Sequence, residues 1–253
     1  MAVVGGRARP GRPRHIPVSE SSSVAPRDQI LQASARLFTS KGFAATSTRE
    51  IAEAVGIRQA SLYYHFAGKD EILAALLGAT VRPSQDKVAQ IEADVSPECP
   101  EVALFLLALV DVHTLVAAPH NVGMLALLPD VVSAGKGEVY AEFQDERRKL
   151  VSSYATFGAR LAERHGLTTS GEALGAMLIQ QVEGVITLRA DGIAVDEARA
   201  NEIAAGCLRL CGCDGDRISR VQRVAEGFVA RHLRADVPGT REKCRSTEQT
   251  EGE

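Results

Sequence analysis

Apolar residues recur at helical intervals along almost the whole chain of 253 residues, and they predict its first helix near Pro26. Ile30, Ala33 and Leu37 share one face at this spacing. Proline is favoured in the first turn of a helix, and glycine readily takes the left-handed conformation that often follows the end of one. Gly42 suits that second position. We therefore expect a helix that starts near Pro26 and ends just before Gly42.

The next segment predicts two short helices separated by a tight turn. Ser47 and Glu50 have the spacing of a capping box, in which each caps the other's backbone at a helix start. Gly56 ends that helix, a third helix covers about residues 59–65, and a longer one begins near Lys69. Two helices around a glycine turn are typical of a helix-turn-helix unit, although helical hairpins without a DNA function share the pattern.

The rest of the chain also has helical periodicity, with few aromatic residues and no alternating run that predicts a strand, so we expect an all-α fold. The further helices are expected at residues 70–93, 100–117, 121–133, 137–165, 170–190, 196–212 and 214–234. The chain divides into a flexible basic arm (1–26), a helix-turn-helix unit (27–77), a large helical domain (78–235) and a disordered tail (236–253).

Composition excludes several classes of protein. Hydrophobic residues make up 45% of the chain, enough for a substantial core. The longest apolar stretch, Val102 to Val110, is too short to cross a membrane, and the N-terminus lacks the apolar region of a secretory signal. We therefore expect a cytoplasmic protein without a membrane contact. The net charge of −3 hides an asymmetry, because residues 1–76 carry ten basic and six acidic side chains, which favours a polyanion contact there.

The cysteines give a weaker signal. Five cysteines without a secretion signal indicate reduced thiols. Cys207, Cys211 and Cys213 are close enough in sequence to bind a soft metal or to sense oxidants. Their spacing matches no standard zinc pattern, however, and free cysteine is often a small buried apolar residue. We expect no metal and no cofactor.

Residues 48–57, 61–66 and 68–70 together strongly resemble the DNA-binding domain of the TetR family of regulators, over about residues 27–77. The resemblance implies a homodimer of all-helical subunits whose N-terminal units bind a palindromic operator in double-stranded DNA. It also implies that the helix-turn-helix unit (27–77) binds DNA and that the C-terminal domain (78–235) dimerises and holds a pocket for a small-molecule effector. The dimer interface is expected in the last two core helices, either 170–190 with 196–212 or 196–212 with 214–234. Most members repress, and ligand binding usually releases DNA.

A recognition helix presents its N-terminal residues to base edges in the major groove. Gln59 can pair with adenine, Ala60 can meet a thymine methyl group, and the helix start at Lys69 attracts phosphate. Leu62 and Phe66 are four residues apart and take the buried face of this helix. The alternative for Tyr63 and Tyr64 is that they are half-buried aromatics that cap a small core, and Tyr63 is the better candidate for a structural role. The predicted DNA contacts are Thr48, Arg49, Gln59, Ala60, Ser61, Tyr63, Tyr64, His65 and Lys69.

Two basic features flank this unit. Arg58 stands where the family often has a Ser or Thr N-cap, which predicts a weaker cap and a possible phosphate contact. The arm carries Arg12 and Arg14 around Pro13, similar to an AT-hook core that enters a narrow minor groove. The alternative is a solvated tail, and deletion of residues 1–24 would then leave the salt dependence of DNA binding unaltered.

Each of three apolar stripes in the C-terminal part contains one polar residue: His113, Arg147 or Gln181. Ligand pockets are mostly apolar with a few placed polar groups, so these three are the candidate effector contacts. A core hydrogen bond or a charge that reaches solvent explains each of them equally simply.

Other functions have less support. The sequence has no Gly-rich phosphate loop, nucleophile elbow or HExxH motif, so we expect no enzyme. A ligand-binding helical protein without DNA would not need the segment from Ser61 to Lys69. An architectural DNA binder would not need a large acidic C-terminal domain. A ligand-responsive repressor is therefore the predicted function.

Overall fold

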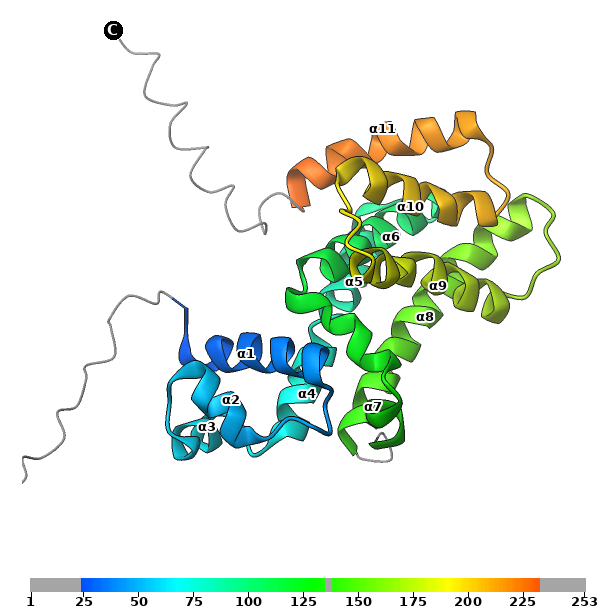
Figure 1. Cartoon of the computed structure of the whole chain (residues 1–253). Helices are drawn as coiled ribbons and strands as arrows, with labels where there is room; N and C mark the ends of the chain where they lie inside the picture. Colours follow the sequence, from blue (N-terminus) through cyan, green and yellow to red (C-terminus); the bar gives the residue numbers. More distant parts are fainter. Residues whose placement is uncertain (1–23, 135–137, 233–253) are drawn as a thin grey trace, which may run out of the picture.

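The computed structural model describes residues 24–134 and 138–232, which form helices and connecting turns without a β-strand (Figure 1). The most N-terminal helices lie at one end of the molecule and the most C-terminal ones at the other. The helices are α1 (Pro26–Lys41), α2 (Thr48–Val55), α3 (Gln59–His65), α4 (Lys69–Gly78), α5 (Arg82–Asp94), α6 (Pro100–Ala117), the 3-10 segment η1 (Pro119–Leu127), α7 (Pro129–Ala134), α8 (Glu138–Arg164), α9 (Gly171–Ala190), α10 (Glu197–Leu210) and α11 (Gly215–His232).

Local sequence signals place the first helices where we expect them. Pro26 is in the first turn of α1, and α2 begins with the complete capping box of Ser47 and Glu50. Gly56 ends α2 in the left-handed conformation, with φ of 79° and ψ of 24°. A side chain there would be strained, so glycine defines the turn of the helix-turn-helix. Gly42 also has positive φ, at 92°, but an extended ψ of 155° rather than a left-handed helical one.

A small apolar core holds the N-terminal helices together. Phe38 of α1 packs edge-on against Phe43, whose ring centroid is 5.1 Å away. Leu62 is the buried residue of α3, and Phe66 follows it at the end of that helix. Burial of Leu62 and Phe66, four residues apart, confirms the predicted inner face of the recognition helix and turns the rest of α3 toward solvent.

Helix α6 is the centre of the C-terminal part. It packs against α5, α8, α9, α10 and α11, and almost all of its side chains are buried. It is long and apolar enough to cross a membrane, but 78% of the helix is buried inside the protein. A helix that is apolar on every face is expected at the centre of a helical protein as well as in a membrane.

The structure corrects two predicted helices. The expected helix at 70–93 is interrupted between α4 and α5, where Pro83 lies in the first turn of the second piece. The expected helix at 121–133 is the 3-10 segment η1 followed by α7, which starts at Pro129. Proline cannot donate the helical hydrogen bond, so a new helix starts at each site. Within η1, His120 and Asn121 both have φ of 52°.

The N-terminal unit is attached to the C-terminal part at several points. Helix α1 packs on η1, and α4 packs on both η1 and α8. After the break, the Nε atom of Arg82 lies 2.8 Å from Glu146 of α8. On the other side of η1, Asn121 donates a 2.8 Å bond to the carbonyl of Ile186 in α9. Segment η1 therefore lies between helices α1 to α4, which form the predicted DNA-reading unit, and the helices behind them.

Candidate nucleic-acid interface and effector site

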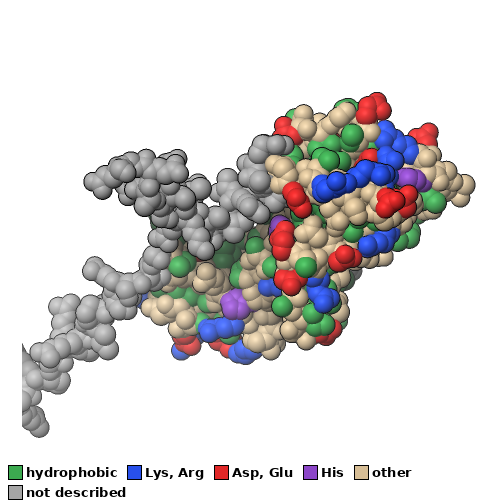
Figure 2. Space-filling view, turned by 90° about the horizontal axis from the view of Figure 1, so that it is seen from above, with side chains coloured by type: hydrophobic (Ala, Val, Ile, Leu, Met, Phe, Trp, Pro, Cys, Tyr) green, Lys and Arg blue, Asp and Glu red, His purple; other side chains and the backbone are tan. Residues whose placement is uncertain are grey.

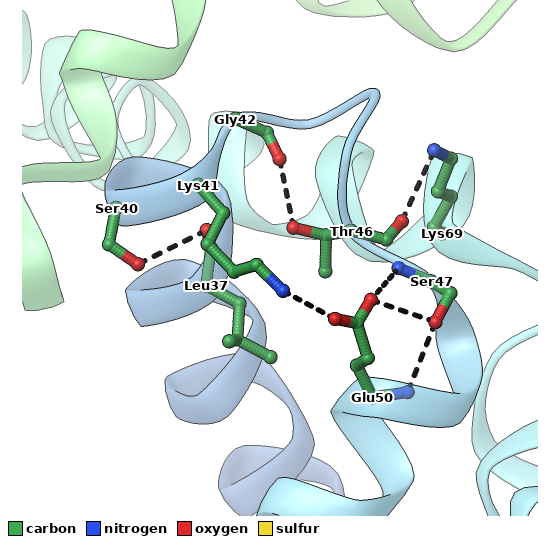
Figure 3. A network of polar contacts seen from close by, with 8 residues as sticks. All are labelled: Leu37, Ser40, Lys41, Gly42, Thr46, Ser47, Glu50 and Lys69. Atoms are coloured by element: carbon green, nitrogen blue, oxygen red, sulfur yellow. Dashed lines mark hydrogen bonds and ion pairs between the residues drawn. The ribbon is translucent and has the colours of Figure 1, made fainter.

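The start of α2 is fixed by a surface network of polar groups (Figure 3). The Glu50 carboxylate accepts from the backbone N–H and the hydroxyl of Ser47, both at 2.9 Å, and it pairs with Lys41 of α1. The Lys41 ammonium and the Ser47 donors lower the pKa of Glu50 to about 2. The network fixes the orientation of α2, whose first N–H groups point to solvent.

Lys69 has a structural role in addition to its predicted DNA contact. Its ammonium donates to the carbonyls of Phe43 at 3.0 Å and of Ala44 and Thr46 at 3.3 Å. It also lies 4.5 Å from the centre of the Phe43 ring, in a cation–π contact. Lys69 thus holds the loop between α1 and α2 against the start of α4, and Figure 3 shows its bond to Thr46.

A surface hollow of about 460 Å³ opens between these elements. The starts of α2 and α4 both border it, and helix starts offer free backbone N–H groups and a positive dipole end to an anion. The lining residues are Ala44, Ala45, Thr46, Ser47, Thr48, Tyr63, Ala67, Gly68 and Lys69. The hollow thus joins two helix starts and the Lys69 side chain next to α3.

Helix α3 presents the predicted base-reading residues to solvent. Gln59, Ala60 and Ser61 are exposed, and so is Tyr64, with 88% of its surface accessible. Tyr63 is half-exposed, and His65 is intermediate, its ring packed edge-on against Tyr64. The arrangement leaves a polar surface on one side of a helix that is anchored by Leu62 on the other.

Three of the predicted contacts are bonded to one another. The Gln59 amide nitrogen is 2.9 Å from the hydroxyl oxygen of Thr48 and 3.4 Å from that of Tyr63. The two hydroxyl oxygens are 3.1 Å apart. The side chain of Arg58, the N-cap residue, caps nothing, which agrees with the weak cap expected from the sequence. Arg49 is exposed and pairs with Glu53 at 2.9 Å.

A buried polar cluster lies around Asp111 on the central helix α6. Ser84 donates to one oxygen of Asp111 at 2.8 Å, and the Tyr154 hydroxyl donates to the other at 3.0 Å. Burial raises the pKa of Asp111 to about 7, although both donors act in the opposite direction. Burial also raises the pKa of Tyr154. A carboxyl group with this pKa changes its charge close to neutral pH.

Arg147 and Glu183 extend this cluster toward a small cavity. Two nitrogens of Arg147 bond the two oxygens of Glu183 at 2.7 and 2.6 Å. The cavity between the pair and Asp111 has a volume of about 30 Å³. It is also lined by Thr80, Val81, Leu115, Gly123, Ala126, Leu150, Ile179 and Ile186. Of the three predicted effector contacts, Arg147 lies at this cavity.

The other two candidates lie elsewhere. His113 is near the surface, with its Nε2 atom 3.1 Å from Glu197 of α10. Gln181 is exposed on α9, where its amide nitrogen covers Gly206 of α10 so closely that a β-carbon there would be 2.7 Å away. The structure therefore does not bring His113, Arg147 and Gln181 together.

The effector contacts predicted from the sequence do not include Asp111, Ser84, Tyr154 or Glu183. One signal for Asp111 was present, because an acidic residue follows directly on the longest apolar stretch of the chain. A charge in an all-round apolar helix needs a buried partner. Its partners, Ser84 and Tyr154, are 27 and 43 residues away in sequence, so no local pattern identifies them.

Three cysteines are buried in α10 and just after its end: Cys207, Cys211 and Cys213. Burial raises the pKa of Cys207, and it raises the pKa values of Cys211 and Cys213 to about 11. Thiols in this state are poor nucleophiles and poor metal ligands. Within residues 24–134 and 138–232, no group of His, Cys, Asp and Glu residues is arranged to hold a metal ion.

Comparisons with known proteins agree on one family. Residues 30–76 match the family model for bacterial regulatory proteins of the tetR family. The repressor KstR2 of Mycolicibacterium smegmatis is 38% identical over 61 residues, which are 24% of this chain and 30% of that protein. This chain covers only 24% to 40% of the length of the curated transcriptional regulators that it matches.

Solved structures extend the likeness to the C-terminal part. The crystal structure of Mycobacterium smegmatis AmtR is 33% identical, with a TM-score of 0.73 over 83% of this chain and 97% of that one. AibR, solved with isovaleryl coenzyme A and operator DNA, has a TM-score of 0.56 at 18% identity, over 72% of this chain and 95% of its own, and shows the same fold. A helix-turn-helix with an exposed recognition helix, the family model that matches it and a likeness over almost all of AmtR lead to one conclusion: this chain belongs to the TetR family of bacterial regulatory proteins.

Proposed function

We propose that this protein is a cytoplasmic homodimeric repressor that binds a palindromic operator and leaves it when a small molecule binds the C-terminal part. The observation that carries the proposal is the exposed polar surface of α3 beside the hollow at the starts of α2 and α4. This surface offers base-edge contacts from Gln59 and Ala60 next to a site suited to phosphate.

The predicted DNA contacts divide into two groups in this proposal. Gln59, Ala60 and Ser61 reach bases, because they are at the exposed start of the recognition helix. The remaining residues contact the DNA backbone in this proposal. Thr48, Tyr63 and Lys69 do so at the hollow, and Arg49, Tyr64 and His65 do so from outside its lining. All three donors of Lys69 face loop carbonyls, so its effect on DNA is mainly its positive charge and the loop it holds.

The dimer surface in this proposal is the outer face of α9 with α10. The exposed residues of α9 from Ala173 to Thr187 carry no charge, and they include the small residues Ala176 and Gly184. A face of this kind allows two helices to approach closely. The outer face of α11, in contrast, exposes the charged residues Arg220, Arg223 and Glu226. This contrast favours α9 and α10 over α10 and α11.

The proposed effector site is the cavity beside Arg147. At about 30 Å³ it has room for little more than a water molecule, so an effector has to enlarge it. Its walls include Thr80 and Val81 at the break between α4 and α5, and Gly123 and Ala126 of η1. Because α1 and α4 pack on these segments, enlargement of the cavity would displace the DNA-reading unit. AibR, solved with both a ligand and operator DNA, is a relative in fold that binds both.

Selection of binding sites from random duplex DNA by the purified full-length protein tests the function. We expect an enriched palindrome whose half-sites lie about 34–36 Å apart, one helical turn of DNA. A Gln59→Ala variant should lose selectivity at one position of each half-site, whereas Gln32→Ala, at an exposed glutamine on α1 outside the predicted contacts and the dimer surface, should retain it. Salt-sensitive binding without an enriched sequence would contradict the proposal, because it would indicate phosphate contacts alone.

A further inference from the structure

Thr48, Gln59 and Tyr63 form a closed triangle of polar atoms on the DNA-reading surface. Thr48 begins α2, whereas Gln59 and Tyr63 are one turn apart on α3. The amide nitrogen of Gln59 is 2.9 Å from the Thr48 hydroxyl and 3.4 Å from the Tyr63 hydroxyl, and the two hydroxyl oxygens are 3.1 Å apart. The contact therefore ties the end of the Gln59 side chain to both helices of the helix-turn-helix.

The geometry of the triangle determines which N–H bond of the Gln59 side chain can still bond to DNA. Two oxygens only 3.1 Å apart subtend a small angle at the amide nitrogen, much less than the roughly 120° between the two N–H bonds of a planar amide. One N–H bond of Gln59 can therefore point at the pair of hydroxyls, and the other cannot. The second N–H bond and the carbonyl oxygen remain available at an exposed position.

A free amide oxygen beside a free N–H matches one base in the major groove. Adenine presents the N7 acceptor and the N6 amino donor side by side, whereas guanine presents two acceptors, N7 and O6. A glutamine that rotates freely can turn its amide to suit either a donor or an acceptor. A glutamine held by one N–H cannot do so without breaking its bonds to Thr48 and Tyr63.

We propose that Thr48 and Tyr63 are positioning residues that hold the Gln59 amide in the orientation that reads adenine, and so set the specificity of one position in each half-site. The inference rests on the proposed function and adds the contacts that fix the orientation of the amide. Preorganisation of this kind raises selectivity because the side chain loses little rotational freedom on binding.

The test measures binding of the full-length protein to its selected operator, with each base substituted in turn at every half-site position. For the wild type we expect one adenine whose replacement weakens binding by roughly 5- to 150-fold. Replacement of that adenine by 7-deaza-adenine, which lacks the N7 acceptor, or by purine, which lacks the amino group, should each weaken binding. Gln59→Ala should abolish the preference at that position and leave the other positions unchanged.

The positioning role is tested by removing single hydroxyl groups. Tyr63→Phe and Thr48→Val should each reduce the adenine preference by roughly 3-fold or more, without changing the preference at other positions. Thr48→Ser keeps the hydroxyl group and should therefore retain the adenine preference of the wild type. In the Gln59→Ala background, the same two substitutions should have no further effect on this position. Gln59 and Tyr63 are exposed and Thr48 is only partly buried, so thermal unfolding should be nearly unchanged and serves as the check on folding.

Two results would overturn the inference. If Tyr63→Phe and Thr48→Val weaken binding equally for every sequence, these residues only contact the backbone. A guanine that depends on Gln59 would contradict the proposed orientation, because the free amide oxygen would then face the O6 acceptor of that base. In both cases the operator itself is still found, so the proposed function stands; a wild-type protein that enriches no sequence would instead remove the function and this inference with it.

Discussion

The two ends of this molecule satisfy their polar side chains in opposite ways. In the DNA-reading unit, the contacts lie at the surface, and the capping pair of Ser47 and Glu50 is three residues apart in sequence. In the C-terminal part, Asp111 is fully enclosed and bonded to Ser84 and Tyr154, which come from distant helices. The first arrangement follows from local sequence, whereas the second exists only after the helices have packed.

The difference also has an energetic meaning. An exposed polar contact exchanges partners with water and contributes little to stability, whereas a buried one is costly to disturb. Apolar burial follows the same division, since α3 has one buried residue within its bounds and α6 is buried almost throughout. We therefore expect the DNA-reading unit to depend on few apolar anchors, and the C-terminal part to depend on its buried polar cluster.

The largest effect should come from Leu62→Ala, which removes the buried anchor of α3. Loss of a fully buried leucine costs about 2–5 kcal/mol, and little else holds this short helix. We expect a lower unfolding midpoint by urea titration together with loss of DNA binding. Tyr64→Ala is the matched control, because Tyr64 is 88% exposed and should affect DNA binding alone. Equal stability of both variants would contradict the comparison.

Asp111→Asn should show how the buried cluster depends on pH. The folded protein raises the pKa of this carboxyl from 3.8 to about 7, so it binds the proton more tightly than the unfolded chain does. The wild type therefore loses stability as pH rises from about 4 to about 7, and the asparagine variant avoids that loss. The variant should gain on the order of 3 kcal/mol over the wild type between pH 4 and pH 8.

Unfolding of both proteins by urea at a series of pH values measures this effect. Asp191→Asn, a change at an exposed residue, serves as the control and should track the wild type. A stability difference between Asp111→Asn and the wild type that stays constant across this range would show that the carboxyl is not enclosed as described.

The smallest effect should come from helix caps, and it should be the same in both parts. Ser47 accepts from the N–H of Glu50 at 3.2 Å, and Ser170 accepts from Ala173 at 3.2 Å at the start of α9. Ser47→Ala and Ser170→Ala should each cost about 1 kcal/mol, measured by thermal unfolding. Ser152→Ala, at an exposed position inside α8, should cost less than either. A much larger cost for only one cap would mean that local chemistry is not equivalent in the two parts.

Helices that carry their own start and stop signals could be predicted from sequence. The capping box, the end of α2 at Gly56 and the inner face of α3 were all predicted from residues close to one another. The interruption between α4 and α5 was missed, although Pro83 marks it, because apolar periodicity continues across the break. Periodicity reports which face is buried, and it does not report whether the backbone hydrogen bonds are continuous.

The effector candidates were harder to predict for a related reason. A polar residue on an apolar stripe can point to a cavity, to a neighbouring helix or to solvent, and spacing alone does not separate these cases. Arg147 faces the cavity, whereas His113 pairs with Glu197 near the surface and Gln181 packs over Gly206. The bonding of Gln59 to Thr48 and Tyr63 was missed as well, because it depends on how α2 and α3 cross.

The packing of α1 on η1 limits how far the DNA-reading unit can be treated as a module. The break after Gly78 is an obvious junction for a chimera that joins this unit to the C-terminal part of a relative. Yet the partner of α1 comes from residues 119–127, on the far side of α5 and α6 in the chain. A working chimera would have to transplant both segments, so operator choice and effector response cannot be recombined here by a single crossover.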